Sequence, residues 1–212
     1  MLRQGLALLK AAWDMGINTV DTANSYSNGE SEKIVGEFLT KVSLLPNSSI
    51  DRTMMMVSQY NIPRDNMVIL TKINFLVGSD PASMAAFDPT LPNTREYVNQ
   101  GGLSRSAIFN QVDACLRRLK TTYIDVLQIH AFDPATPFDE TMKALHDLVV
   151  GGKVRYLGAS NLRAWQLAEM NHTAEIHGWT QFTSMQLEHS LLYRTEVGCR
   201  YLIECRLWKS DS

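Results

Sequence analysis

Several polar side chains stand at the carboxyl ends of stretches that the sequence predicts as β-strands. They are Asp21, Lys72, His130, Ser160 with Asn161, and Gln186. Tyr26 follows the first of them, in a turn that continues through Gly29–Glu32. A lysine cation near a tyrosine stabilises the phenolate, so Tyr26 beside Lys72 could act as a general acid toward a carbonyl that is being reduced. Asp21 would keep Lys72 charged, and His130 could orient the carbonyl oxygen.

Each of these residues also has a plainer interpretation. Asp21 could cap the turn that Gly29 completes, and Lys72 could be a solvated strand end. His130 could be a histidine at the rim with its hydrogen bonds satisfied. For any one residue alone the plainer interpretation is favoured. Their repeated placement at the same end of successive strands favours a joint function, because residues without a role need not all occur there.

The elements that must position these residues alternate along the chain. Apolar periodicity predicts helices over residues 2–15, 31–39, 104–119, 136–150 and 165–176, and strands over residues 18–23, 67–71, 123–129, 154–157 and 182–186. This order predicts a parallel sheet with crossover helices, either open and doubly wound or closed into a barrel. The G-x-G-x-x-G fingerprint of an open dinucleotide-binding sheet does not occur. We therefore predict an α/β fold of the (β/α)8 TIM-barrel type.

Two segments fit this alternation less simply. The apolar run Met54–Val57 predicts an extra packed helix. The connection over residues 74–102 contains three prolines and exceeds the usual loop length, which is typical of functional or mobile loops.

Composition excludes several classes of protein. With 212 residues, 20 basic and 22 acidic, the chain fits one large domain and gives no basic surface for nucleic acid. Three scattered cysteines fit a reducing compartment, and neither a signal peptide nor a membrane-spanning run is recognisable. We therefore expect a cytoplasmic protein without a membrane partner. The histidine spacing predicts no metal site, and the motifs of nucleophile-elbow hydrolases and P-loop kinases do not occur.

Taken together, these stretches resemble the aldo-keto reductase family. The resemblance is carried by Gly16–Ala23 with Tyr26 and Gly29–Glu32, Ile69–Lys72, Tyr123–His130, Gly152–Asn161, and Gln186 with Leu191–Arg194. They occur in the family's order and span residues 5–197. The long connection before Gly102 and the run Gly102–Arg105 look most like the fungal branch of aryl-alcohol dehydrogenases.

The resemblance implies a barrel that binds NADPH without a Rossmann motif and reduces an aldehyde or ketone, or oxidises an alcohol. By position, the catalytic residues would be Asp21, Tyr26, Lys72 and His130. Ser160, Asn161 and Gln186 would hold the nicotinamide carboxamide. The fungal branch also suggests secondary metabolism, with an aryl aldehyde or a polyketide-derived intermediate as the small-molecule substrate.

The chain departs from the family at both ends. We expect an incomplete barrel over residues 1–197, without the first strand and the last strand–helix units, and a divergent tail over residues 198–212. Its length is below the ~250 residues of a complete barrel. An incomplete barrel would leave open strand edges through which the chain could self-associate. Two alternatives stay open: an inactive barrel fragment that serves as a partner-binding or regulatory subunit, and a different barrel enzyme with a phosphate site.

Overall fold

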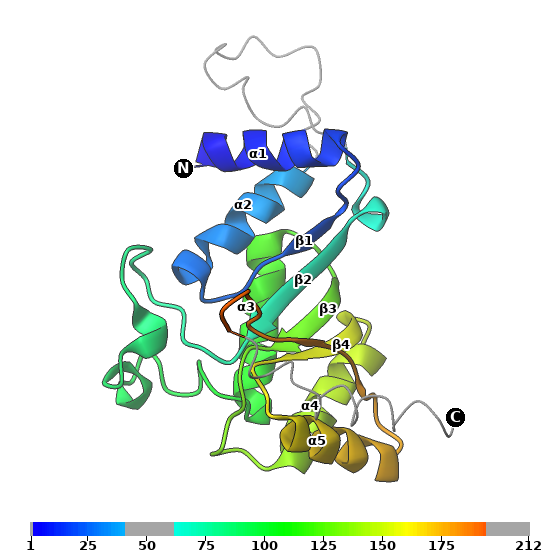
Figure 1. The fold of residues 1–212 in the computed structure, drawn as a ribbon. Coiled ribbons are helices and arrows are strands. Elements are labelled where there is room, and N and C mark those ends of the chain that lie inside the picture. Colours follow the sequence, from blue (N-terminus) through cyan, green and yellow to red (C-terminus); the bar gives the residue numbers. More distant parts are fainter. Residues whose placement is uncertain (1, 41–61, 194–212) are drawn as a thin grey trace.

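The computed structural model describes residues 2–40 and 62–193, in which helices and strands alternate (Figure 1). The α-helices are α1 (Leu2–Asp14), α2 (Glu30–Leu39), α3 (Arg105–Leu119), α4 (Phe138–Val150) and α5 (Ala164–Ile176). The strands are β1 (Thr19–Asp21), β2 (Val68–Ile73), β3 (Ile124–Ile129), β4 (Val154–Ser160) and β5 (Phe182–Gln186). The predicted alternation is confirmed, with element ends that differ by a few residues.

The five strands form one parallel sheet in the order β1-β2-β3-β4-β5, so each strand pairs with its neighbours in the chain. The register sets Val20 beside Ile69, Lys72 beside Gln128, and Ser160 beside Gln186. Successive strands are joined through helices, as parallel pairing requires. The sheet is curled, and with its helices it forms part of a (β/α)8 barrel, which confirms the predicted fold class.

The helices cover one face of this sheet. Ile69, Leu127 and Leu157 are completely buried in the main hydrophobic core, which lies between the sheet and the helices. Val68 and Tyr156 precede two of these residues and therefore point to the other face, because side chains alternate along a strand. They are 37% and 59% exposed. The sheet is thus buried on its helix side, whereas these two apolar side chains are exposed on its other side.

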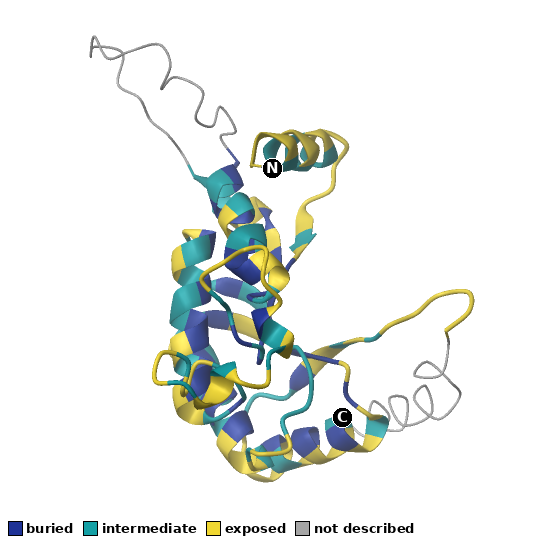
Figure 2. Ribbon diagram, turned by 90° about the vertical axis from the view of Figure 1, so that its left-hand side faces the viewer, coloured by how far each residue is buried: buried dark blue, intermediate teal, exposed yellow. Residues whose placement is uncertain are grey.

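Helix α1 lies at the edge of the structure and has no fully buried residue (Figure 2). Its inner face packs Leu6, Leu9 and Trp13 against a small cluster that includes Phe38 and Met67. Val20 and Leu39 contact both this cluster and the main core. None of the helices within residues 2–40 and 62–193 is long and apolar enough to cross a membrane.

A buried carboxylate fixes α2 against its neighbours. Glu32 is completely buried and accepts hydrogen bonds from Thr71 Oγ1 of β2 and Arg118 Nε of α3, both at 2.6 Å. Gly29 precedes α2 with φ +89°, and a Cβ there would lie 2.6 Å from the Arg118 side chain. The turn between Tyr26 and α2 is therefore held between a strand and a helix.

The structure extends two of the sequence predictions and leaves two others outside the described residues. The strand predicted to end at Leu157 runs through Ser160, which places Ser160 inside the sheet rather than in the following loop. The connection over residues 74–102 contains two short 3-10 helices, Ala85–Phe87 and Leu91–Asn93. The helix predicted around Met54–Val57 and the boundary between residues 197 and 198 lie outside the described residues.

Candidate active site

The carboxyl ends of β1 and β2 carry an ion pair. Lys72 Nζ donates to both carboxylate oxygens of Asp21, at 2.8 and 2.9 Å, and to the backbone oxygen of Thr22 at 3.0 Å. The Lys72 side chain is only 2% exposed, whereas that of Asp21 is 37% exposed. The buried ammonium is thus compensated by three acceptors. The carboxylate remains open to the rim of the sheet.

Tyr26 lies next to this ion pair, in the turn that follows β1. Lys72 Nζ is 5.2 Å from the centre of the Tyr26 ring, and the His130 ring meets it edge-on with centroids 5.8 Å apart. The Tyr26 side chain is partly open to solvent, so an approaching molecule can reach it. Three chemically different groups from separate elements therefore meet at this rim.

His130 comes directly after β3, where its backbone N–H donates to the Ile73 oxygen at 2.8 Å. Burial, and to a smaller extent the nearby Lys72 cation, lower the pKa of its imidazole to about 4 against the opposing effect of the Asp21 carboxylate. The ring is therefore neutral near pH 7. Its Nδ1 atom is buried without a hydrogen-bond partner, which favours the tautomer with the proton on Nε2. A neutral Nε2–H can donate a hydrogen bond to a carbonyl oxygen.

The residues expected at the nicotinamide lie along the same rim. Ser160 ends β4 and is buried, and Asn161 follows it with φ +52°. Asn161 Nδ2 donates to Ser160 Oγ at 3.2 Å and to the His130 backbone oxygen at 3.0 Å. Gln186 ends β5, and its Nε2 donates to Asp21 Oδ2 at 2.9 Å. Hydrogen bonds and ring contacts thus connect all seven residues singled out in the sequence.

The rim also contains residues that the sequence did not single out. Gln128 is buried beside Lys72 in the sheet register, and its Nε2 lies 3.4 Å from Asp21 Oδ1. Phe75 packs against His130 with ring centroids 4.9 Å apart. Asn24 donates to the Phe75 backbone oxygen at 3.1 Å. Alternation within the predicted strand 123–129 would have placed Gln128 on the inner face, whereas the Phe75 contact depends on a loop whose path no local pattern reveals.

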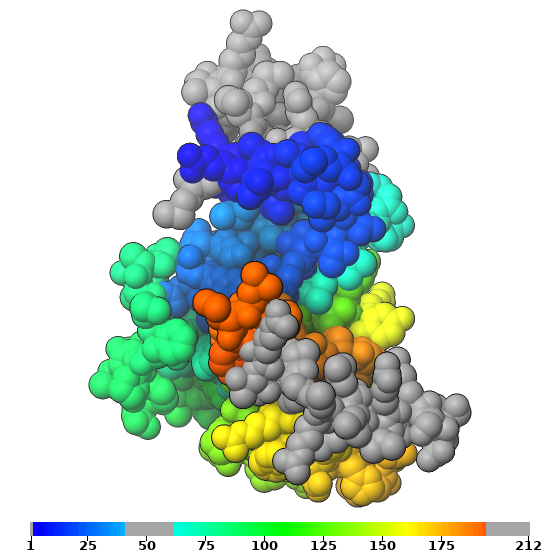
Figure 3. All heavy atoms as spheres, viewed as in Figure 1, coloured from blue at the N-terminus to red at the C-terminus, as the bar shows by residue number. Residues whose placement is uncertain are grey.

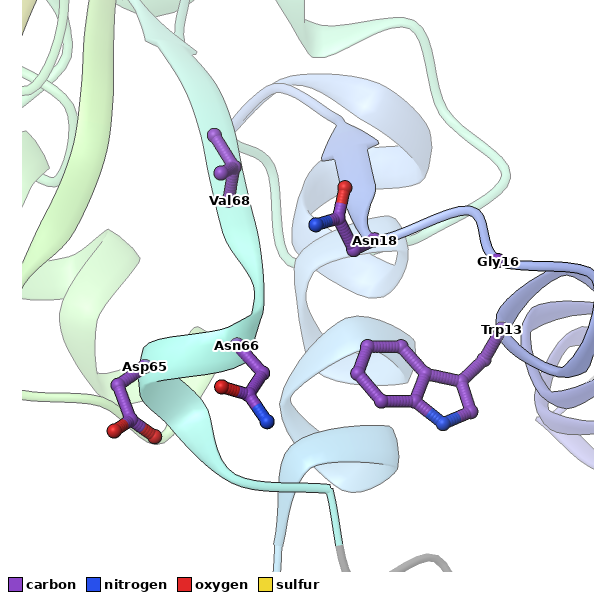
Figure 4. Close-up of a pocket in the computed structure, with 6 residues that line it drawn as sticks. All are labelled: Trp13, Gly16, Asn18, Asp65, Asn66 and Val68. Carbon is purple, nitrogen blue, oxygen red and sulfur yellow. The ribbon is translucent and has the colours of Figure 1, made fainter.

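A hollow lies at the opposite, amino end of the sheet. It has a volume of about 510 Å³ and is lined by Trp13, Gly16, Asn18, Asp65, Asn66 and Val68 (Figure 4). Among the residues that line this hollow, Asp65 is the only one with an ionisable side chain. The hollow therefore lacks the combination of lysine, tyrosine and histidine found at the carboxyl ends of the strands. Across the part of the chain that the structure describes, no group of three or more His, Cys, Asp or Glu residues is arranged to hold a metal ion.

The fold and the rim define an α/β barrel-type protein with its polar groups at the carboxyl ends of the strands, where barrel enzymes keep their active sites. Comparison with known proteins gives the family. The model of the aldo/keto reductase family matches residues 3–205, and the chain belongs to this family of oxidoreductases. The resemblance read from the sequence is confirmed.

Three curated fungal proteins illustrate the similarity. The chain is 51% identical over 201 residues to the aldo-keto reductase AFTS1 of Alternaria alternata, covering 92% of this chain and 50% of that protein. It is 45% identical over 193 residues to the aryl-alcohol dehydrogenase-like protein C977.14c of Schizosaccharomyces pombe, covering 89% and 50%. It is 42% identical over 193 residues to the versiconal hemiacetal acetate reductase of Aspergillus parasiticus, covering 91% and 51%. The chain therefore spans about half the length of these relatives.

Proposed function

We propose that this chain carries the catalytic rim of an NADPH-dependent reductase that converts an aldehyde or ketone to an alcohol, or catalyses the reverse oxidation. The observation that carries the proposal is the contact of Tyr26 with both Lys72 and His130 at the carboxyl ends of the strands. The coarser statement, that family members reduce carbonyl groups with a nicotinamide cofactor, follows from the family itself.

In the proposed mechanism Tyr26 donates its hydroxyl proton to the carbonyl oxygen. Bound NADPH supplies the hydride that reduces the carbonyl carbon. Lys72, charged and paired with Asp21, stabilises the phenolate that Tyr26 becomes. His130, neutral near pH 7, donates from Nε2 to the carbonyl oxygen and orients it. The new C–H and O–H bonds replace the carbonyl π bond, and the tyrosine regains a proton from solvent.

The donors and acceptors at the rim fit a nicotinamide carboxamide. We propose that Ser160, Asn161 and Gln186 hold it, because a hydroxyl and two side-chain amides can both donate to and accept from such a group. The Gln186 amide is 2.9 Å from the Asp21 carboxylate, so cofactor binding would exchange one hydrogen bond for another. The preference for NADPH over NADH is part of the proposal.

The substrate is proposed to be a small uncharged carbonyl compound of secondary metabolism. Support comes from relatives whose names include an aryl-alcohol dehydrogenase and a versiconal hemiacetal acetate reductase.

Among the residues that the structure describes, β1 and β5 each pair on one side only, which supports the further proposal that the chain self-associates. Gel filtration at several concentrations would test it.

The test is a pair of measurements on the purified chain. Loss of NADPH absorbance is followed with an aromatic aldehyde, and NADPH binding is followed by quenching of tryptophan fluorescence. Tyr26→Phe removes only the hydroxyl, so we expect turnover to fall about 10³-fold while cofactor binding persists. A wild-type chain that folds but neither binds nor oxidises NADPH would overturn the proposal and favour the alternative of a partner-binding barrel fragment.

A further inference from the structure

The turn after the catalytic tyrosine contains a buried asparagine in a left-handed conformation. Asn28 has φ 50° and ψ 48° and is 6% exposed. It stands two residues after Tyr26 and two residues before α2, the helix that the buried Glu32 anchors. Asparagine tolerates this backbone conformation better than most residues. Conformation alone does not account for its burial.

The Asn28 side chain binds a distant part of the chain with both ends of its amide. Its Nδ2 donates to the backbone oxygens of Asp80 and Ser83 at 2.6 and 2.9 Å, with Ser83 Oγ at 3.1 Å. Its Oδ1 accepts from the backbone N–H of Gly78 at 2.9 Å. A single side chain therefore satisfies three backbone groups of residues 78–83, which belong to the long connection after β2.

The connection borders a hollow. The hollow has a volume of about 470 Å³ and is lined by the connection itself and by the loop after β3. The far end of the connection is tied by the Gly102 N–H to the Asn74 oxygen and by the Leu103 N–H to Asp133, both at 2.7 Å. Asn28 ties its middle. In Figure 3 the connection, teal to green, lies against the blue surface of the segment that includes α2.

The segment held by Asn28 leads to an aromatic row that ends at the catalytic groups. Phe87 lies 5.8 Å from Phe75, Phe75 lies 4.9 Å from His130, and His130 lies 5.8 Å from Tyr26, measured between ring centroids. Phe87 is 70% exposed. A large apolar side chain left this open beside a polar site is suited to contact an apolar ligand.

We propose that Asn28 is a positioning residue that holds residues 78–87 against the tyrosine turn, so that Phe87 forms a wall for the apolar part of the substrate. We call the hydrogen bonds from the Asn28 side chain to residues 78–83 the clamp. The substrate role of Phe87 rests on the proposed reductase function, whereas the clamp does not. The clamp joins the turn that carries Tyr26 to the connection that carries Phe75, which packs against His130. Loss of the clamp would move Phe87 and leave the proton donor Tyr26 in place.

The clamp is tested by hydrogen–deuterium exchange of the whole chain without substrate. Asn28→Gly removes the side chain at a backbone conformation that glycine adopts freely. The matched control is Ser27→Gly, because Ser27 has a similar φ of 47° but an exposed side chain. We expect amides of residues 76–88 to exchange about tenfold faster in Asn28→Gly and at the wild-type rate in Ser27→Gly. Exchange in α3 should stay unchanged. Equal rates in both variants and the wild type would overturn the clamp.

The wall is tested by steady-state kinetics with two aldehydes. For an aromatic aldehyde, Phe87→Ala and Asn28→Gly should each raise KM about tenfold with kcat within threefold of wild type, because ground-state contacts are lost and the proton donor is not. For acetaldehyde, KM should stay within twofold. An unchanged KM of Phe87→Ala for the aromatic aldehyde would overturn the wall. Absence of wild-type turnover would refute the reductase function and the wall with it, while exchange rates still decide the clamp.

Discussion

Each end of the parallel sheet carries an ion pair, and the two pairs are built differently. At the carboxyl end, the Asp21 carboxylate also accepts from the side chains of Gln186 and Gln128, so the pair with Lys72 belongs to a set of side chains. At the amino end, Arg64 pairs with Asp125 at 2.6 Å. The two side chains of this second pair form most of their other hydrogen bonds with backbone groups, and these bonds fix where β2 and β3 begin.

The amino-end pair ties two strands together. Arg64 donates to the backbone oxygens of Met67 and Tyr123 at 2.8 and 3.0 Å. Asp125 accepts from the backbone N–H of Ile69 at 2.9 Å. An ion pair bonded to backbone secures strand positions, whereas one bonded to side chains holds charge where a ligand can use it. The hollow of about 510 Å³ at the amino end is not the better candidate site, because its lining has no cation, tyrosine hydroxyl or imidazole.

The largest expected effect separates charge from stability at the carboxyl end. Lys72→Met keeps most of the side-chain volume and removes the buried ammonium. We expect turnover to fall about 10²–10³-fold because the Tyr26 phenolate loses its cation. The free energy of unfolding should change by less than about 1 kcal/mol, because the variant no longer buries an ammonium group, and the Asp21 carboxylate that loses its partner is 37% exposed and still accepts from Gln186. Initial rates and urea unfolding measure the two quantities. A variant that unfolds readily but turns over normally would reverse the interpretation of this pair.

The matching change at the amino end should do the opposite. Arg64→Met breaks the pair with Asp125 and two hydrogen bonds to backbone, so the free energy of unfolding should fall by about 2 kcal/mol. Turnover at a temperature where the variant is folded should stay within twofold. The control is Arg117→Met, the same chemical change on an exposed side chain of α3, for which we expect no effect. Equal destabilisation by both variants would mean that the Arg64 contacts add nothing.

The smallest effect is a dependence of stability on pH. The His130 pKa falls from 6.5 to about 4 on folding, so the unfolded chain binds a proton more readily between these values. The contribution of His130 is complete above pH 6.5 and is lost as the pH falls toward 4. We expect about 1 kcal/mol, allowing for the partial exposure of the ring. Urea unfolding at pH 4.5 and 7 measures it, and the difference between these pH values should shrink in His130→Gln. An identical difference in that variant would assign the dependence to other groups.

The sequence predicts most of the fold because its signals are local. Strand β5 is predicted at residues 182–186, where the structure places it, although only Phe182 and Met185 in it are apolar. The sequence predicts only residues 154–157 of strand β4, because Gly158, Ala159 and Ser160 have weak strand preferences. Pairing of Ser160 with Gln186 on the neighbouring strand overrides those preferences.

The residues of the candidate site at strand ends could be predicted from the sequence, whereas the contacts made by loops could not. Placement at strand ends predicted the set from Asp21 to Gln186, because parallel strands bring their carboxyl ends together whatever the loops do. The partners of Asn28 could not be predicted, since they are backbone groups about fifty residues away in an irregular connection. Residue type reveals which groups can do chemistry, whereas loop paths decide what surrounds them.

The strand order has a consequence for how the chain is made. Within residues 2–40 and 62–193, each strand of the sheet pairs only with strands adjacent to it in the sequence. During synthesis from the amino terminus, every new strand can therefore join an edge that already exists, and no strand has to insert between two that are already paired. The longest wait comes before β3 can pair with β2, because residues 74–123 form the longest segment between successive strands of the sheet. After β3 has paired, the sheet can grow in the direction of translation.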